Sequence, residues 1–401
     1  MPKLLIINIT CNQGSTGKIS EQIGGLMQER EWDVYLAHGA RRVNSSKLKT
    51  IPFSNMKVEF FHALKSLMFD SDGLGSICTT KKLIKKIKEI KPDIIQLNNL
   101  HGYFINYKIL FKYLNSTDIP IVMTLHDCWA FTGHCTHFEG ANCNRWLSKC
   151  YNCPLKLKRP KVSLLFDRSK RNFEYKKKYL GCSPNLNIIA VSEWIGNLAE
   201  QSILKNHQIN IFHNGIDLSV FKPYDKNKSN TFTILGVANV WYEDKGLNDI
   251  YELRKQLPLD KYQIILVGLS ERQIKKLPKG IVGIRRTSNQ TELAKLYSDA
   301  NVLVNPTYAD TFPTVNLEAL ACGTPVVTYK TGGSPEAIDE KTGIVVEQGN
   351  VNALVDAIKQ IREFPFLSEN CRSRAEQLFN KDKCFEKYID LYEKIIQCRC
   401  S

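Results

Sequence analysis

The sequence predicts an α/β protein with two doubly wound parallel-sheet domains. The chain has 401 residues, about the length of two ordinary domains. Short β-branched apolar runs alternate with amphipathic stretches up to about residue 215, and this alternation resumes at residue 231. Between the two series lies a polar segment, Pro223–Asn230, which reads as a linker.

The first series contains five predicted strands and three predicted helices. Leu83, Ile84 and Ile87 share one face of the predicted helix Lys81–Lys91, which is the pattern of an amphipathic helix. Ligands of such sheets bind beyond the carboxyl ends of the strands, where His126 and Asp127 are expected. The strands are expected at Lys3–Asn8, Val34–Ala37, Asp93–Asn98, Pro120–Leu125 and Ile188–Val191, and the helices at Gly14–Gln28, Lys81–Lys91 and Ser192–Gln201.

The second series has the same alternation. Thr314–Ala321 is expected to be a helix, which Cys322–Gly323 ends before Pro325. Ser334 is expected to cap a short helix that has Pro335 at its first position. The other elements are predicted strands at Thr231–Ala238, Ile264–Val267, Ile281–Ile284, Val302–Val304 and Val326–Thr328, and predicted helices at Val351–Arg362 and Asp382–Ile396.

Charge is divided unevenly along the chain. The formal net charge is +15, and residues 1–215 hold 30 Lys and Arg against 16 Asp and Glu, which leaves +14 in this half. Lys81–Lys91 and Leu155–Leu180 concentrate Lys and Arg beside apolar side chains. The first half is therefore expected to meet an anionic partner: nucleic acid, an anionic membrane surface or a diphosphate-linked acceptor.

The sequence shows neither a long apolar segment nor a signal peptide. No apolar run approaches the roughly 18 residues of a transmembrane helix. Leu4–Ile9 reads as a buried strand, because no small-residue cleavage site follows it. We therefore expect a cytoplasmic protein.

Asp310 and Glu318 mark the most informative stretch. A strand leads into the loop that carries Asp310, and Glu318 lies in the helix that follows. The N–H groups and the dipole at a helix N-terminus hold phosphate, and a carboxylate accepts two hydrogen bonds from a pair of hydroxyls. These features suit a nucleotide sugar. The alternative is an ordinary buried strand–helix–strand unit in which Glu318 is a helix acid.

The full string resembles the signature of retaining glycosyltransferases of family 4. In this family, a Glu is followed after seven residues by a second Glu and then by an Ala-Cys-Gly-Thr-Pro-like turn. Here Asp310 stands in the first position, Glu318 in the second, and Ala321–Pro325 forms the turn. The departure is Asp for the first Glu, which keeps the charge and shortens the side chain by one methylene.

The resemblance implies a fold of two Rossmann-like domains that face a cleft, known as GT-B. Residues 1–212 would bind the acceptor, residues 213–380 the nucleotide-diphosphate sugar, and residues 381–401 would form a helix that returns to the first domain. Asn214–Asp217 resembles the turn at which family members leave the first domain. The donor-binding residues implied are Gly14, Gly17, Lys245, Arg285, Arg286, Asp310, Thr311, Phe312, Pro313, Thr314, Val315 and Glu318.

Three residues would act in catalysis: His126, Lys245 and Asp310. In the family, an Arg and a Lys-Gly pair hold the donor diphosphate. Lys245-Gly246 matches, whereas Asn239, Val240 and Trp241 cover the region of the Arg. We expect Arg285 or Arg286 to supply the second cation, with solvent exposure of both as the alternative. The resemblance implies no divalent metal in the chemistry.

The cysteines suggest a structural metal site. The chain has 13 Cys, five of them between Cys128 and Cys153. A cytosolic chain rarely forms disulfides, and Cys150-x-x-Cys153 is a common zinc-binding element. Cys135, Cys143, Cys150 and Cys153 are the predicted ligands, His134 and His137 are additional candidates, and the alternative is free or buried thiols.

The interpretation favoured by the residues and the resemblance is an enzyme of bacterial exopolysaccharide, lipopolysaccharide or capsule synthesis. The string His126–Pro154 is similar to a subgroup acting in colanic-acid-like pathways. A polyprenyl-diphosphate-linked acceptor would place it on the inner face of the cytoplasmic membrane as a peripheral protein. The alternatives are a nucleotide-sugar 2-epimerase or, more distantly, a phosphorylase of the same fold, and a basic nucleic-acid-binding protein. No recognition motif supports the last.

Overall fold

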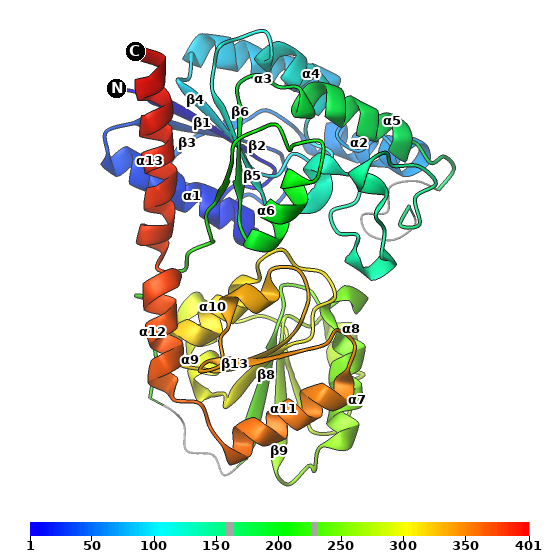
Figure 1. Cartoon of the computed structure of the whole chain (residues 1–401), viewed down its shortest axis with the longest axis vertical. Coiled ribbons are helices and arrows are strands. Elements are labelled where there is room, and N and C mark those ends of the chain that lie inside the picture. Colours follow the sequence, from blue (N-terminus) through cyan, green and yellow to red (C-terminus); the bar gives the residue numbers. More distant parts are fainter. Residues whose placement is uncertain (157–163, 226–230, 401) are drawn as a thin grey trace. The chain divides into compact units, whose positions relative to one another are not determined.

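The protein folds into two compact units, seen here in a computed structural model (Figure 1). The structure describes residues 1–156, 164–225 and 231–400. Residues Met1–Phe212 and Phe385–Ser401 form unit 1, and residues His213–Cys384 form unit 2. The predicted linker Pro223–Asn230 and the basic segment Leu155–Leu180 lie partly outside the described residues.

Unit 1 contains a seven-stranded parallel sheet in the order β3-β2-β1-β4-β5-β6-β7. Leu4, Leu5, Ile6 and Ile7 of the central strand are all fully buried, as expected for a strand covered on both faces. The strands are β1 Lys3–Asn8, β2 Asp33–His38, β3 Lys49–Pro52, β4 Ile94–Leu97, β5 Ile121–Leu125, β6 Leu186–Ala190 and β7 Ile209–Ile211.

Helices cover this sheet, and the last of them comes from the end of the chain. Tyr392 of the C-terminal helix is buried against Trp32, and Arg30 at the end of α1 forms an ion pair with Glu386. The helices are α1 Gly14–Glu29, α2 Met56–Phe69, α3 Ile77–Ile90, α4 Tyr107–Leu114, α5 Ser169–Lys176, α6 Glu193–Glu200 and α13 Lys381–Cys400, and the short helix η1 spans Cys128–Phe131.

Unit 2 contains a six-stranded parallel sheet in the order β10-β9-β8-β11-β12-β13. Its strands are β8 Phe232–Val237, β9 Tyr262–Val267, β10 Ile281–Ile284, β11 Val302–Asn305, β12 Val326–Tyr329 and β13 Gly343–Val346. The two parallel sheets confirm the predicted fold class.

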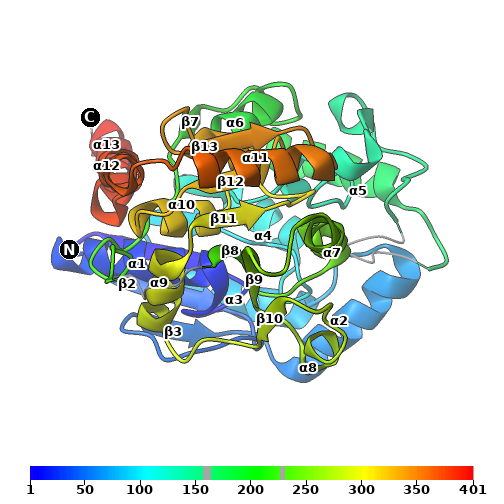
Figure 2. The same ribbon diagram turned by 90° about the horizontal axis from the view of Figure 1, so that it is seen from below.

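Helix α11 lies over β12 and β13 and packs against α7, whereas α10 packs on α9 and α12 (Figure 2). The helices of unit 2 are α7 Leu247–Gln256, α8 Glu271–Ile274, α9 Gln290–Asp299, α10 Thr314–Ala321, α11 Val351–Glu363 and α12 Ser368–Leu378, with the short helices η5 Glu243–Lys245 and η6 Ser334–Ala337. The predicted cap of η6 was wrong, because Gly333 is the N-cap and Ser334 is the first helical residue. In the parts of the chain that the structure describes, no helix combines the length and the apolar character needed to cross a membrane.

Candidate active site

The loops after β8 and β11 meet at the carboxyl ends of these neighbouring strands. Gly246 has a φ of 71°, and a Cβ atom there would lie 2.1 Å from the carbonyl oxygen of Pro306. The Tyr308 N–H donates to the carbonyl oxygen of Asp244 at 2.8 Å. Glycine is therefore required at position 246, because a side chain would push the two loops apart.

This close approach brings Lys245 onto Asp310. Lys245 Nζ lies 2.7 Å from Asp310 Oδ2 and also donates to the Ala309 carbonyl oxygen at 3.1 Å. The Lys245 side chain is 29% exposed and that of Asp310 24%, so solvent reaches both. An ion pair in such a position can take up an additional anionic group without the cost of opening a fully buried pair.

Helix α10 begins directly after this loop. Its N-cap is Pro313, which offers no side-chain cap, so the first turn presents backbone N–H groups suited to an anion. Thr311, Phe312 and Pro313 are buried, whereas Thr314 and Val315 are half-buried. Thr311 Oγ1 is buried without a hydrogen-bond partner among the described residues. The start of α10 is thus rich in donors.

Glu318 lies one turn further along α10 and is half-buried. The hydroxyl of Tyr297 on α9 donates to Glu318 Oε2 at 2.9 Å. Burial, together with this neighbouring carboxylate, raises the pKa of Tyr297 well above its ordinary value, so the tyrosine stays a hydrogen-bond donor. Tyr297 therefore fixes the orientation of the carboxylate that the sequence singled out.

A buried polar network holds α10 against the sheet. Asn316 is fully buried; it accepts from Asn305 Nδ2 at 2.9 Å and donates to Ser334 Oγ at 3.0 Å. Ser334 Oγ in turn lies 2.7 Å from Thr328 Oγ1. This network explains why Ser334 is not a cap: its hydroxyl supports the helix that carries Glu318.

Arg285 and Arg286 do not join this group of residues. Both are exposed, and Arg285 forms an ion pair with Glu271 at 3.0 Å. They follow β10, which β9 separates from β8. Since neighbouring strands are about 4.8 Å apart, two strand spacings separate them from the loop of Lys245. The second cation predicted from these residues is not beside Lys245.

Gly14 and Gly17, two of the implied donor-binding residues, lie at the start of α1 in unit 1. Different local reasons account for glycine at these two positions. Gly14 begins α1 with a φ of 70°, a conformation that favours glycine. Gly17 packs closely, because a Cβ atom there would lie 2.6 Å from Thr10 Oγ1. Internal packing thus accounts for Gly17, whereas Gly14 has open space around it.

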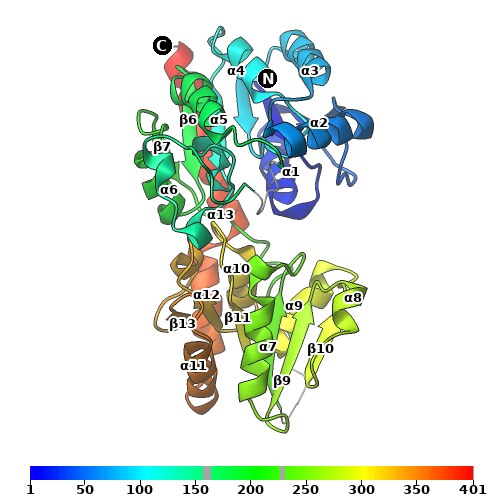
Figure 3. The same ribbon diagram turned by 90° about the vertical axis from the view of Figure 1, so that its right-hand side faces the viewer.

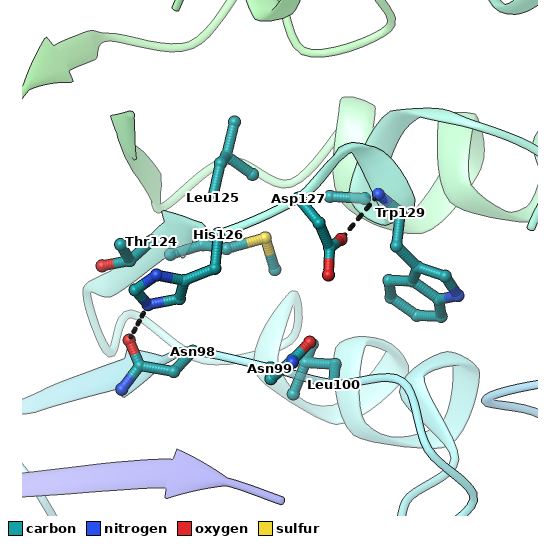
Figure 4. A pocket seen from close by; sticks show the side chains of 10 residues that line it. Asn98, Asn99, Leu100, Thr124, Leu125, His126, Asp127 and Trp129 are labelled. Carbon is teal, nitrogen blue, oxygen red and sulfur yellow. Dashed lines mark hydrogen bonds between the residues drawn. The ribbon is translucent and has the colours of Figure 1, made fainter. Parts of the chain in front are cut away.

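His126 lies in a small pocket at the carboxyl end of β5 (Figure 4). Its Nε2 is 3.3 Å from Asn98 Oδ1, and Asn98 Nδ2 donates to Ser20 Oγ of α1 at 2.7 Å. Burial lowers the pKa of His126 to about 4, so the imidazole is neutral at pH 7. A neutral imidazole can donate one hydrogen bond and accept another, which suits a sugar hydroxyl.

Beside His126, the structure pairs the expected Asp127 with His101, a residue that the sequence analysis missed. Asp127 Oδ2 is 2.7 Å from His101 Nε2. Asp127 Oδ1 accepts from the N–H of Trp129, as Figure 4 shows. Burial alone would raise the pKa of Asp127, but His101 leaves it below its ordinary value. Burial would likewise lower the pKa of His101, and the Asp127 carboxylate raises it overall. No local motif around His101 announces this pair.

Lys176 lies in the basic stretch Leu155–Leu180, which was expected to face an anionic partner, but the structure buries its side chain. It is 1% exposed, and its Nζ lies 3.7 Å from the centroid of the Trp129 ring. Burial lowers its pKa to about 8. Lys176 thus belongs to the core beneath η1 and not to a basic surface.

The cysteine-rich segment places three metal-binding side chains together. Ligand atoms of His134, Cys135 and Cys153 all lie within 4.8 Å of one another. Cys143 and Cys150, the other predicted zinc ligands, line a small pocket together with Cys135 and Cys153.

Two protein-family descriptions match adjoining parts of the chain. Residues 27–220 match the family described as Glycosyltransferase Family 4, and residues 221–378 match the one described as Glycosyl transferases group 1.

Two relatives of the chain are also named as glycosyltransferases. The chain is 25% identical over 330 residues to the Escherichia coli (strain K12) protein WcaC, which is named as a glycosyl transferase of colanic acid biosynthesis; the match covers 76% of this chain and 77% of WcaC. It is 32% identical over 173 residues to the D-inositol 3-phosphate glycosyltransferase of Mycobacterium tuberculosis (strain F11), covering 38% of this chain and 36% of that protein.

Solved structures share the whole fold. Sucrose-phosphate synthase from Thermosynechococcus elongatus superposes with a TM-score of 0.73 at 19% identity, covering 99% of this chain and 100% of that one. Anabaena HepE in complex with UDP-glucose gives 0.65 at 14% identity, covering 98% and 99%. WaaG, a glycosyltransferase of lipopolysaccharide biosynthesis, gives 0.67 at 15% identity, covering 97% and 99%.

Proposed function

Because this chain belongs to the glycosyltransferases that join a family 4 domain to a group 1 domain, we propose that it is a retaining enzyme that uses a nucleoside diphosphate sugar. The observation that carries the proposal is the Lys245–Asp310 pair at the start of α10. A cation, a helix N-terminus and a carboxylate on the same helix are the groups that a sugar diphosphate needs.

We assign roles in the transfer to Thr314, Val315, Lys245, Glu318 and Asp310. The N–H groups at Thr314 and Val315 and the Lys245 ammonium hold the diphosphate. Glu318 accepts hydrogen bonds from the ribose or sugar hydroxyls, and Asp310 orients the sugar while it positions Lys245. As the bond between the sugar and the diphosphate breaks, negative charge grows on the leaving oxygen, and Lys245 stabilises it. The acceptor hydroxyl passes its proton to the leaving diphosphate oxygen and forms the new glycosidic bond with retained configuration.

We infer that the donor-binding step needs no divalent metal, since protein cations and a helix N-terminus can meet the diphosphate charge. The HepE structures are named as complexes with UDP and UDP-glucose, which makes UDP-sugars the first donors to test. Unit 1 would bind the acceptor, with His126 contributing a hydrogen bond to the transferred sugar.

The experiment is a thermal-shift screen of nucleoside diphosphate sugars, followed by mass spectrometry of the products with a candidate acceptor. Nuclear magnetic resonance of the anomeric proton then establishes the configuration. An α-linked donor should yield an α-linked product. Inverted configuration would contradict a retaining enzyme, and a 2-epimer formed without acceptor would point to an epimerase instead.

We further propose that unit 1 docks on an anionic membrane, where a polyprenyl-diphosphate-linked glycan of surface polysaccharide synthesis would be found. Helix α2 supports this because its apolar side chains point outward: Phe60 is 59% and Phe61 67% exposed. The same helix buries Glu59 and exposes Lys57 and Lys65. The exposed apolar residues of this surface are Met56, Phe60, Phe61, Leu64 and Met68 on α2 with Leu164, Leu165 and Phe166.

Unit 1 also exposes basic residues on the helix that follows α2 in the chain. Helix α3 follows α2 on the same side of unit 1 (Figure 3), and Lys82, Lys85 and Lys86 on it are exposed. Apolar side chains that enter the headgroup region and cations that meet anionic lipids together give stable peripheral binding. Each cation near the surface contributes about 1 kcal/mol. The site would be the inner face of the cytoplasmic membrane.

Sedimentation with vesicles tests this docking. Wild type should bind vesicles with anionic lipid at low salt, and the variants F60S/F61S and K82Q/K85Q/K86Q should lose most of this binding. Two matched controls on unit 2 should bind like wild type: F364S, which removes another exposed Phe, and K275Q/K276Q/K279Q, which removes the same charge. Equal losses in the controls, or no binding of wild type, would contradict a docking surface on α2 and α3.

A further inference from the structure

We propose that His134, Cys135, Cys150 and Cys153 bind one zinc ion that fixes the cysteine-rich segment, residues 128–156. Among the residues that the structure describes, His134, Cys135 and Cys153 are the one group of three metal-ligating side chains whose ligand atoms gather within 4.8 Å. The donor set of thiolates and an imidazole is the one that zinc prefers in structural sites.

The distances fit a tetrahedral site. Zn–S bonds of about 2.3 Å in a tetrahedron place two sulfurs about 3.8 Å apart. Cys135 Sγ and Cys153 Sγ are 3.9 Å apart, too far for a disulfide and close to this edge length. His134 Nε2 is 3.0 Å from Cys153 Sγ. A zinc ion would widen this separation to about 3.5 Å, a change that a side chain can absorb.

Cys150 is the fourth ligand that we assign. It precedes Cys153 by three residues, the spacing of a zinc knuckle, and its thiol is buried in the pocket that Cys135 and Cys153 also line. The Gly133 N–H lies 3.2 Å from Cys150 Sγ and the Leu155 N–H 3.4 Å from Cys153 Sγ. N–H groups that donate to sulfur in this way stabilise thiolates. Cys143 lines the same pocket but is more exposed and serves as the control.

The surroundings of His134 support a metal. The Asp70 carboxylate is fully buried and lies 3.3 Å from His134 Nδ1. Zinc-binding histidines usually offer their second nitrogen to a carboxylate. Asp70 is itself fixed, because its Oδ2 accepts from the Arg168 N–H at 2.7 Å and its Oδ1 from Asn172 Nδ2 at 3.0 Å. The second nitrogen of the imidazole therefore lies beside a buried carboxylate, although the two atoms are not aligned as a hydrogen bond here.

The contacts of the cysteine-rich segment indicate what the zinc ion would stabilise. The Cys128 N–H of η1 donates to the Thr136 carbonyl oxygen at 2.8 Å, and the Cys153 N–H donates to Asp167 just before α5. The segment thus joins η1, which follows His126 and Asp127, to α5. A zinc ion would hold this connection together with the buried aromatic cluster of Phe131, Phe138 and Trp146. It would act on the pocket of His126 by position and not by chemistry.

Zinc content tests the proposal. The full chain, purified under reducing conditions without chelator, should contain about one zinc ion by plasma mass spectrometry. H134A, C135S, C150S and C153S should lose it, and C143S should retain it. Circular dichroism and thermal unfolding establish whether each variant is folded. Wild type loaded with Co²⁺ should show the visible absorption of tetrahedral cobalt with thiolate ligands, a readout that needs no variant.

Three results would overturn the assignment. One is reduced wild-type protein that contains no zinc and gives no cobalt absorption. Another is a Cys135–Cys153 disulfide found by peptide mapping of protein isolated under thiol-blocking conditions. The third is loss of zinc in C143S with retention in C150S or H134A, which would give the site a different ligand set.

Discussion

At the scale of single residues, Lys245 carries the largest expected effect. Its ammonium group lies 2.7 Å from Asp310 Oδ2, and in the proposed mechanism it meets the charge that develops on the leaving diphosphate. K245A should lower turnover about 10²-fold or more, as for loss of one donor to a developing oxyanion. Initial rates at saturating donor measure this. K330A is the matched control, because Lys330 pairs with Glu347 on the exposed surface; similar losses in the two variants would remove Lys245 from the mechanism.

Glu318 should govern donor affinity. E318Q keeps the shape of the side chain but replaces a charged acceptor, whose hydrogen bonds contribute about 1.5–3 kcal/mol, so the donor Kd should rise about 10- to 100-fold. Y297F removes only the hydroxyl that orients Glu318 and should raise Kd by a smaller factor. Calorimetric titration of the donor measures both. An unchanged Kd in E318Q would show that Glu318 does not touch the donor.

His126 should make stability depend on pH. The folded protein holds its pKa near 4, whereas the unfolded chain protonates it below about pH 6.5. As pH falls from 6.5 towards 4, the unfolded state binds the extra proton, so the free energy of unfolding falls. Denaturant unfolding of wild type and H126Q measures this. The difference in free energy of unfolding between wild type and H126Q should shrink as pH falls below 6.5 and should be constant above pH 7. The titration of His101 affects both proteins equally and does not contribute to this difference.

The contact between Lys245 and Asp310 also shows where sequence reasoning ends. The Asp310/Glu318 spacing and Lys245-Gly246 were visible as motifs, but 65 positions separate Lys245 from Asp310. Their meeting depends on the loop after β8 approaching Pro306 over a glycine, which no local pattern reports. The Asp127–His101 pair escaped notice for the same reason.

At the scale of elements, periodicity predicted several helices and strands correctly but not α4, α7 and α9, although each of these helices buries one apolar face. Thr314–Ala321 and Lys3–Asn8 match α10 and β1 residue for residue. Helix α2 was missed because its pattern is reversed: Phe60 and Phe61 face outward, whereas Glu59, His62 and Ser66 are buried. The edge strands β3, β7 and β13, of three or four residues each, were also missed, whereas the equally short edge strand β10 was predicted with its observed bounds, Ile281–Ile284.

Helix α13 supports the pocket of His126 through a hydrogen-bond chain inside unit 1. The Tyr392 hydroxyl donates to Gln96 Oε1 at 2.8 Å, and Gln96 Nε2 reaches Asn98 Oδ1 at 3.2 Å. Asn98 in turn contacts His126. Y392F should lower the free energy of unfolding by about 1–3 kcal/mol, because it leaves a buried acceptor unpaired.

The double variant Y392F/Q96L distinguishes this explanation from lost packing. Gln96 Nε2 also donates to Thr124 Oγ1 and Asn98 Oδ1, so Q96L has a cost of its own. If the Tyr392–Gln96 hydrogen bond is stabilising, the loss in the double variant should be smaller than the sum of the losses in Y392F and Q96L. Denaturant unfolding of the two single variants and the double variant measures the coupling. Additive losses would mean that the hydrogen bond contributes little.

At the scale of the whole molecule, the proposed chemistry should not depend on added metal. Since protein groups are assigned to the diphosphate, activity should survive EDTA and should not rise with magnesium. Turnover before and after chelation measures this. Activity restored by magnesium would contradict the metal-free mechanism, whereas restoration by zinc alone would implicate the loop of Cys135–Cys153.

The C-terminal helix constrains how such enzymes can be recombined. Unit 2 ends at Cys384 and unit 1 resumes at Phe385, inside one uninterrupted helix, Lys381–Cys400. A chimera that exchanges residues 1–212 alone would pair a foreign sheet with the resident Tyr388 and Tyr392, which are buried within unit 1. A chimera that transfers acceptor specificity between relatives should therefore take residues 1–212 and the C-terminal helix from the same protein. These two segments should be exchanged together.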